Sequence, residues 1–177
     1  MAEEASSAPA APAAAAVAGE GKMTMVVGVN ESEHSLYALQ WTLQHFFAPA
    51  QPQLYRLAVV TAKPAAAAAV GLAGPGAFTD VLPLVEADLN RSATGVVDKA
   101  RDLCAHSQVS DAVFEVAEGD ARGVLCDAVE RHHAEMLVVG SHGHGAIKRA
   151  VLGSVSDYCA HHAHCTVMIV KKPKHKH

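Results

Sequence analysis

The chain has 177 residues, and 14 Lys and Arg against 18 Asp and Glu give it a formal net charge of −4. This balance provides no general attraction for nucleic acid or for an anionic membrane, so neither partner is expected. No apolar run approaches the length of about 18 residues that a membrane-spanning helix needs. The basic tail at residues 173–177 is interpreted as a solvated end, with local nucleic-acid binding as the alternative.

Residues 1–22 are rich in Ala and Pro and almost free of aromatic and β-branched side chains. Such a segment buries too little apolar area to offset its ordering entropy, so it is predicted to be a disordered arm. Glu3 and Glu4 argue against a secretory signal and against an organellar transit peptide. A cytoplasmic location is expected, with a nuclear one as the alternative. Residues 23–172 suit one domain.

The first half of this domain alternates between two periodicities. Residues 23–29 form a continuous apolar run, which is typical of a strand buried on both faces. From Ser32, apolar residues recur at helical spacing as far as Phe47, with Asn30 and Ser32 as candidate caps. Residues 54–62 predict a second strand. Residues 63–78 are small and rich in Gly and Pro, so they are expected to form a mobile surface loop.

The second half repeats the alternation. A long helix is predicted from Thr79 to about His106, although it contains Pro83 and Gly95. Strands follow at residues 112–119, 135–140 and 166–172. Helices are predicted between them at residues 120–134, with Asp120 as the cap, and at residues 153–163. The order βαβαβαβαβ predicts an α/β fold in which helices cover both faces of an open, five-stranded parallel sheet.

Glycines gather between the fourth strand and the fourth helix, in the stretch "VVGSHGHGAIKRAVLGSVS". Gly140 and Gly143 follow the strand, and Gly153 with Ser154 precedes the helix. Glycine permits positive φ and close backbone approach, and the first N–H groups of a helix attract anions. The segment is therefore interpreted as a phosphate site at the carboxyl edge of the sheet, where ligands bind in such folds. The alternative is a tight turn and a cap only.

Two common phosphate motifs do not match this segment. The P-loop pattern G-x-x-x-x-G-K-[ST] is absent, and G-x-G-x-x-G fails because Lys148 occupies the last glycine position. Lys148 or Arg149 could supply a positive charge, and Ser154 and Ser156 could donate hydroxyl groups.

The spacing Gly140-x2-Gly143-x9-Gly153-Ser154, together with the order of elements over residues 23–172, closely resembles the ATP-binding branch of the universal stress protein family, in its plant single-domain form. The resemblance implies a Rossmann-like, adenine nucleotide alpha hydrolase-like fold of three α/β/α layers. It also implies that ATP or AMP lies across the strand ends. Asn30 stands where many members have Asp, which is expected to weaken any dependence on Mg²⁺.

The resemblance assigns the end of the first strand to adenosine, the backbone near Ala62 to adenine, and the glycine segment to ribose and phosphates. No residue is assigned a catalytic or metal-binding role. The nucleotide-binding residues predicted in this way, together with the charged and polar residues of the glycine segment, are Gly28, Val29, Asn30, Ala62, Val139, Gly140, Ser141, Gly143, Lys148, Arg149, Gly153, Ser154, Val155 and Ser156.

The expected function is that of a nucleotide-binding regulatory protein in stress response. The alternative is an interaction or chaperone-like protein in which the nucleotide is structural or absent, with client proteins that the sequence does not identify. No paired carboxylates or Walker-type aspartate can be assigned, so efficient catalysis is not expected. Slow ATP hydrolysis, with His142 as a base, is the third hypothesis. By resemblance, the strand from Thr166 to Lys171 is expected to lie at a sheet edge and to form a homodimer.

Cys104, Cys126, Cys159 and Cys165 contain no Cys-x-x-Cys pair, which favours reduced thiols over a disulfide framework. The cluster of His and Cys at residues 159–165 lacks the standard spacing of a zinc finger. Solvated histidines are expected there, with a zinc site as the alternative.

Overall fold

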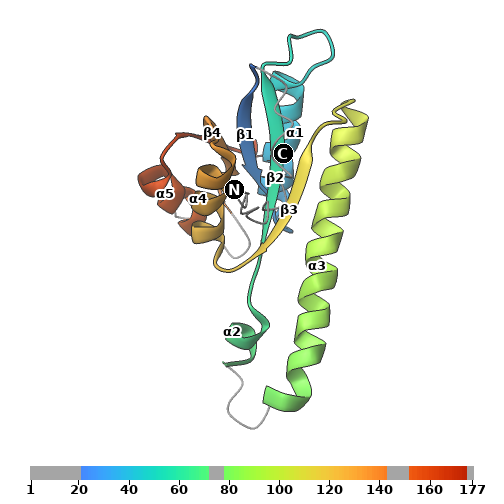
Figure 1. Ribbon diagram of the computed structural model, residues 1–177, viewed down its shortest axis with the longest axis vertical. Helices are drawn as coiled ribbons and strands as arrows, with labels where there is room; N and C mark the ends of the chain where they lie inside the picture. Colours follow the sequence, from blue (N-terminus) through green and yellow to red (C-terminus); the bar gives the residue numbers. More distant parts are fainter. Residues whose placement is uncertain (1–20, 72–77, 143–151, 175–177) are drawn as a thin grey trace, which may run out of the picture.

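The computed structural model describes residues 21–71, 78–142 and 152–174. Its centre is a sheet of five parallel strands in the order β3-β2-β1-β4-β5 (Figure 1). This confirms the predicted sheet. The strands are β1 (Met23–Gly28), β2 (Tyr55–Lys63), β3 (Val113–Glu118), β4 (Met136–Gly140) and β5 (Thr166–Val170).

Helices cover both faces of the sheet, as predicted, because successive residues of a buried strand point to opposite sides. Met25 and Val27 of β1 pack in one apolar cluster with residues of α1 (Glu33–Phe46) and α3 (Phe78–His106). Val26, between them, packs in a second cluster with residues of α4 (Ala121–His132) and α5 (Ser154–His162). The result is a three-layer α/β/α arrangement.

The order of the strands reverses beside β1. From β1 the chain proceeds outward to β2 and β3, and it then returns to β4 on the other side of β1. In parallel sheets this reversal leaves a crevice outside the carboxyl ends of the strands, because the flanking connections leave toward opposite faces. The structure therefore has its topological switch point between β1 and β4.

Two helix starts follow the predicted capping chemistry. The Ser32 hydroxyl accepts a hydrogen bond from the Ser35 amide at 3.2 Å, and Asp120 Oδ1 accepts one from the Arg122 amide at 3.0 Å. These contacts satisfy amide groups that have no partner within the helix. The buried positions of α4 are the predicted Val124, Leu125, Ala128 and Val129.

The prediction that residues 63–78 form a mobile surface loop is wrong for the first part of this segment. Lys63 still belongs to β2, and a short helix, α2 (Ala66–Val70), follows it. Consecutive alanines are the strongest helix formers, and Val70 is buried at 2% exposure. Figure 1 shows α2 beside the first turns of α3, beyond the end of the sheet. Residues 72–77 lie outside the described residues.

The C-terminal part of α5 carries the predicted cluster of His and Cys. His161, His162 and His164 are exposed. Within residues 21–71, 78–142 and 152–174, no group of three or more His, Cys, Asp or Glu is arranged to hold a metal ion. No helix in this part of the chain is both long enough and apolar enough to cross a membrane.

Candidate nucleotide-binding site

A cavity of about 650 Å³ opens at the carboxyl ends of β1, β2 and β4. It therefore lies at the switch point described above. Its floor consists of the strand ends, and its walls come from the start of α5, the start of α4 and the middle of α3. Ten of the predicted site residues line it: Gly28, Val29, Asn30, Ala62, Val139, Gly140, Gly153, Ser154, Val155 and Ser156.

The rim at β2 offers backbone groups to a ligand. The pairing of β1 with β2 ends at Gly28 and Val60, and the Val29 amide donates the last hydrogen bond to the Val60 carbonyl at 3.0 Å. Alternate residues of a strand direct their backbone groups to the same side. The backbone N–H and C=O of Ala62, two residues after Val60, therefore also face the β1 side, beyond the last pair of the ladder. This edge presents one donor and one acceptor, which matches the edge of an adenine ring.

The opposite rim joins the end of β4 to the start of α5. The Gly153 amide donates to the Ser141 carbonyl at 2.7 Å, and the Ser156 hydroxyl is 3.1 Å from the same oxygen. Gly153 is the N-cap of α5 and no side chain caps the helix. The amides of the first turn, from Ser154 to Ser156, therefore remain available at the cavity, where the helix dipole favours an anion.

The Ser156 hydroxyl has a different role from the predicted one. Ser156 is 2% exposed, and its hydroxyl lies within hydrogen-bond distance of the Ser141 and Gly153 carbonyls. Ser141 is equally buried and is absent from the cavity lining. Both serines hold the start of α5 against β4 instead of presenting hydroxyl groups to a ligand.

Two glycines of the described site, Gly28 and Gly140, are explained by close packing. A Cβ at Gly140 would lie 2.8 Å from the backbone carbon and oxygen of His34 and 3.0 Å from the Ser35 nitrogen. A Cβ at Gly28 would lie 2.8 Å from Leu125 Cδ1. Gly153 has φ −71°, which any residue can adopt. Gly140 therefore allows α1 to approach the end of β4.

Some charged and polar residues of the lining were not predicted. They come from the segment after β1, the end of β2 and the middle of α3, and they are Glu31, Ser32, Ser35, Thr61, Lys63 and Ser92. Lys63 is 14% exposed, and its amino group contacts Asn90 Oδ1 at 2.8 Å and Glu118 Oε2 at 3.5 Å. It is a cation in the cavity wall, whereas the predicted cations Lys148 and Arg149 lie outside the described residues, as does Gly143.

The α3 wall could not be predicted from local sequence. Leu89, Ala93 and Val96 line the cavity together with Ser92, whose hydroxyl donates to a carboxylate oxygen of Glu31. The helical periodicity of α3 shows which face is apolar, but the position of this face over the strand ends depends on the crossing of α3 with the sheet. The Ser92–Glu31 contact joins this wall to the segment after β1.

His142, the residue considered as a base for ATP hydrolysis, also lines the cavity. Its Nδ1 lies 3.0 Å from the Ser141 hydroxyl, and its ring centroid is 5.4 Å from that of His34. Among the described residues that line the cavity, Glu31 is the one carboxylate. The arrangement contains no pair of carboxylates for acid and base chemistry.

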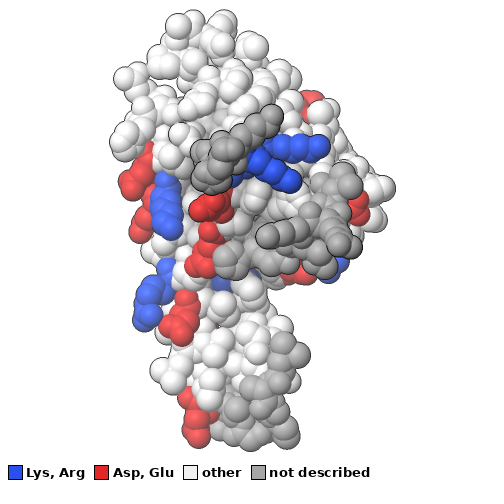
Figure 2. Space-filling view, turned by 180° about the vertical axis from the view of Figure 1, so that it is seen from behind, with Lys and Arg blue, Asp and Glu red and all other residues white. Residues whose placement is uncertain are grey.

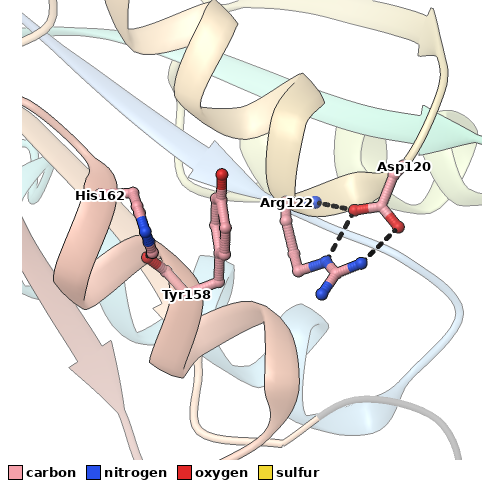
Figure 3. A network of polar contacts seen from close by, with 4 residues as sticks. All are labelled: Asp120, Arg122, Tyr158 and His162. Atoms are coloured by element: carbon pink, nitrogen blue, oxygen red, sulfur yellow. Dashed lines mark hydrogen bonds and ion pairs between the residues drawn. The ribbon is translucent and has the colours of Figure 1, made fainter.

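A network on the outer side of the site joins α4 to α5 (Figure 3). Arg122 Nε contacts Asp120 Oδ1 at 2.9 Å, and the guanidinium carbon lies 5.6 Å from the centre of the Tyr158 ring. Tyr158 stacks on His162 with centroids 4.0 Å apart. Hydrogen bonds from Arg122 lower the pKa of the Asp120 carboxyl. The network holds the two helices whose first turns form one side of the cavity.

The described lining does not fit a resident magnesium ion. Mg²⁺ is held by oxygen ligands, usually one or two carboxylates together with substrate phosphates. Asn30 Oδ1 already accepts hydrogen bonds from the Ser32 amide at 2.8 Å and the Ser35 hydroxyl at 2.9 Å. Glu31 is the one carboxylate of the described lining. No preformed cage for the ion is present among these residues.

Comparison with known proteins decides the family. The sequence model described as "Universal stress protein family" matches residues 23–171. The chain belongs to the universal stress protein family. Universal stress protein PHOS34 of Arabidopsis thaliana is 31% identical over 165 residues, which cover 83% of this chain and 61% of the relative. Universal stress protein PHOS32 of the same plant is 29% identical over 159 residues, with coverages of 83% and 64%. The chain thus spans less than two thirds of either relative.

Solved structures show the same fold. UspA from Lactobacillus plantarum aligns with a TM-score of 0.65 and 17% identity, over 84% of this chain and 97% of that one. A family member from Arabidopsis thaliana with AMP bound gives 0.59 and 20%, over 85% and 92%. A universal stress protein in complex with cAMP gives 0.56 and 23%, over 85% and 97%. The predicted universal stress protein fold is confirmed.

Proposed function

We propose that this chain binds an adenine nucleotide, ATP or AMP, and acts as a regulatory protein in stress response. The observation that carries the proposal is the cavity between the Ala62 backbone and the first turn of α5. Family members of the same fold have been solved with AMP, with cAMP and, in the case of a protein from Archaeoglobus fulgidus, with dAMP. These ligands share the adenine base and a phosphate.

The strand order supports one direction for the proposed nucleotide. Since β1 lies between β2 and β4, the ends of the outer two are separated by two strand spacings, or about 10 Å. This is comparable with the distance between the base and the phosphate of a nucleotide. Adenine would pair with the Ala62 backbone, the ribose would lie over the end of β1, and the phosphate would meet the amides of Ser154, Val155 and Ser156.

The phosphate contacts alone are insufficient for tight binding. A helix N-terminus stabilises an anion by at most about 2 kcal/mol, whereas micromolar affinity requires about 8 kcal/mol. The larger part must come from the base and the ribose, for which the apolar floor of Val29, Val60 and Val139 supplies buried surface. Inorganic phosphate should therefore bind far more weakly than AMP or ATP. Any Mg²⁺ would be held by the phosphates, and only weakly by the protein.

Mass spectrometry of the small molecules released from the purified native protein tests the proposal directly, because a retained adenine nucleotide identifies the ligand. Calorimetry then compares AMP, ATP and inorganic phosphate. Micromolar binding of a nucleotide with much weaker binding of phosphate is expected. Equal affinities for AMP and phosphate, or no nucleotide binding by the folded protein, would overturn the proposal.

The second candidate function is an interaction or chaperone-like protein with a structural nucleotide or none. The surface gives it limited support: Leu84 on the projecting part of α3 is 67% exposed. Figure 2 shows Lys and Arg lying beside Asp and Glu on the displayed face, so the described part of this face has no continuous surface of one charge for a client. Variants that cannot bind nucleotide distinguish the two candidates. Such variants should lose the cellular function if the first candidate holds, and they should keep it if the second holds.

Slow ATP hydrolysis is the third candidate. It predicts multiple-turnover phosphate release that Lys148→Ala or His142→Ala reduces. The lack of paired carboxylates in the described lining makes efficient turnover unexpected.

We also propose a homodimer through the last strand. β5 is the terminal strand of the sheet. Val170 directs its carbonyl toward the β4 side, where it accepts from the Ser141 amide at 3.0 Å. Because backbone directions alternate, the groups of Val167 and Ile169 face the open edge. Pairing with a second copy would satisfy these groups and cover the edge.

The cytoplasmic location remains a prediction from sequence.

A further inference from the structure

We propose that Glu31 recognises the ribose hydroxyls of the bound nucleotide and thereby selects ribonucleotides with an unsubstituted 2′,3′-diol. The inference rests on the proposed function, because it assumes that an adenine nucleotide occupies the cavity. It assigns the selection of the sugar to Glu31. The site residues predicted from the sequence include no carboxylate that could do this.

The position of the sugar follows from the topology. A base at the end of β2 and a phosphate at α5 leave the ribose over the end of β1, the strand between them. Asn30 and Glu31 follow this strand, and both line the cavity. Ribose hydroxyls donate hydrogen bonds, so their recognition needs acceptors at this point. A carboxylate serves this purpose in dinucleotide-binding parallel sheets, where it bonds the ribose 2′-hydroxyl.

Asn30 does not supply the acceptor. Its Oδ1 receives the Ser32 amide at 2.8 Å and lies 2.9 Å from the Ser35 hydroxyl. The Ser32 N–H can only donate, so the amide orientation of Asn30 is fixed with the oxygen toward this turn. The remaining polar group of the side chain is the NH2, which donates. Asn30 can therefore bind a ribose oxygen but not a ribose hydroxyl proton.

The hydroxyl groups of Ser32 and Ser35 are also committed. The Ser32 hydroxyl accepts from the Ser35 amide at 3.2 Å, and the Ser35 hydroxyl lies 3.0 Å from the Ser32 carbonyl. Both serines are 5% exposed. Lys63 is a donor only. Thr61 Oγ1 of β2 has no partner within the described residues, but it is neutral, whereas the Glu31 carboxylate is the charged acceptor among the described side chains that line the cavity near the end of β1.

Glu31 is held where the sugar would lie. Ser92 of α3 donates its hydroxyl to Glu31 Oε1, so the carboxylate spans from the end of β1 to the α3 wall. An ionised carboxylate can accept several hydrogen bonds, and its bonds to hydroxyls are stronger than those between neutral groups. Ser92 acts as a positioning residue, since it reduces the conformations that Glu31 must give up on binding.

Sugar selectivity follows from these roles. AMP offers two hydroxyl protons, dAMP lacks the 2′-hydroxyl, and the 3′-oxygen of cAMP is esterified and carries no proton. A hydrogen bond to a charged group contributes about 1.5 to 3 kcal/mol, which corresponds to at least about a tenfold preference for AMP over either analogue. The unpaired carboxylate left by an analogue increases the discrimination.

Calorimetry with AMP, dAMP and cAMP on the full chain tests the inference, using Glu31→Ala, Ser92→Ala and Glu33→Ala. Glu33→Ala is the matched control, because it removes the same charge two residues further along the chain. The Glu33 side chain contacts Lys172, and Glu33 does not line the cavity. The wild type and the control should prefer AMP about tenfold or more. Glu31→Ala should reduce the preference for AMP over dAMP, which has the same phosphate, to within about twofold, and Ser92→Ala should lower this preference partially.

Two results would overturn the inference while leaving the proposed function intact. The first is AMP binding by the wild type without preference over dAMP and cAMP. The second is an unchanged preference in Glu31→Ala. Failure of the folded wild type to bind any of the three ligands would instead refute the proposed function, and the inference with it. Circular dichroism of each variant verifies the fold.

Discussion

Replacing Ser154 with Pro tests the phosphate site at the level of one backbone amide. Ser154 is the first residue of α5, and Gly153 is its N-cap. Proline is favoured at this position, because the amide it removes has no partner in the helix. Gly153 has φ −71° and ψ 163°, which lies in the region that a residue before proline prefers. The variant should therefore keep α5 and lose one anion donor.

The magnitude follows from the contacts of the first turn. The Asp157 amide is bonded to the Gly153 carbonyl at 3.0 Å, so the amides of Ser154, Val155 and Ser156 are the candidates for a phosphate. Removing one hydrogen bond to a charged group costs about 1.5 to 3 kcal/mol, which is about a 10- to 150-fold loss of AMP affinity. Adenosine has no phosphate, so its affinity should change less than about twofold.

Calorimetry of AMP and adenosine with Ser154→Pro and Ser154→Ala gives the measurement. Ser154→Ala keeps the amide and removes the hydroxyl, so it separates the two groups of this residue. Unchanged AMP affinity in a folded Ser154→Pro protein would refute the placement of the phosphate at α5. Equal losses for AMP and adenosine would show that the substitution disturbs the whole cavity.

Three further outcomes are expected. Gly140→Ala should destabilise the fold by about 1 to 3 kcal/mol through overpacking against His34. Gly95→Ala, which meets open space in α3, should stabilise the fold by about 0.5 to 1 kcal/mol. Denaturant titration compares the two variants, and an equal effect on the free energy of unfolding would contradict the packing argument. Ile169→Pro should convert a dimer into a folded monomer in sedimentation, because it removes an edge amide that β4 does not use; a wild-type monomer at micromolar concentration would refute the dimer. Burial raises the pKa of Cys159 to about 12 and that of Cys104 to about 11, from an ordinary value of 9.0. These groups contribute stability below pH 9.0 that is lost as the pH rises toward 11 and 12, so the melting temperature should fall above pH 9; native protein in which alkylating reagents modify Cys159 readily at pH 8 would contradict this.

The fold was predictable because its signals are local. Continuous apolar runs gave the strands, and the spacing of residues such as Val124 and Ala128 gave the helices, while the parallel order followed from their alternation. The alanines of α2 were a helix signal as well, but the neighbouring glycines and prolines obscured it. Positions that depend on chain crossings, such as Ser92 over the end of β1, have no local signature.

The glycines show how a motif can identify the site for an incomplete reason. Gly140 lies at the predicted place, but the His34 backbone beside it requires the missing Cβ, so the residue would be needed without any ligand. Gly140 and Gly153 do not have a positive φ, whereas Gly119, before α4, has φ 142°. If Gly140 served only to contact phosphate, Gly140→Val would test nucleotide binding alone. Because a Cβ there meets the His34 backbone, this substitution would lower the stability of the fold as well.

The hydrogen bonds on the Ser141 carbonyl bear on how the site meets a ligand. One oxygen at the end of β4 accepts the Gly153 amide and lies within bonding distance of the Ser156 hydroxyl, so three residues fix the start of α5. The start of α5 is therefore tied to the end of β4 by groups whose hydrogen bonds are already made within the protein. Because this anchoring is complete before any ligand arrives, the first-turn amides of α5 need little reorganisation to meet an anion, and less of the binding free energy is lost to ordering.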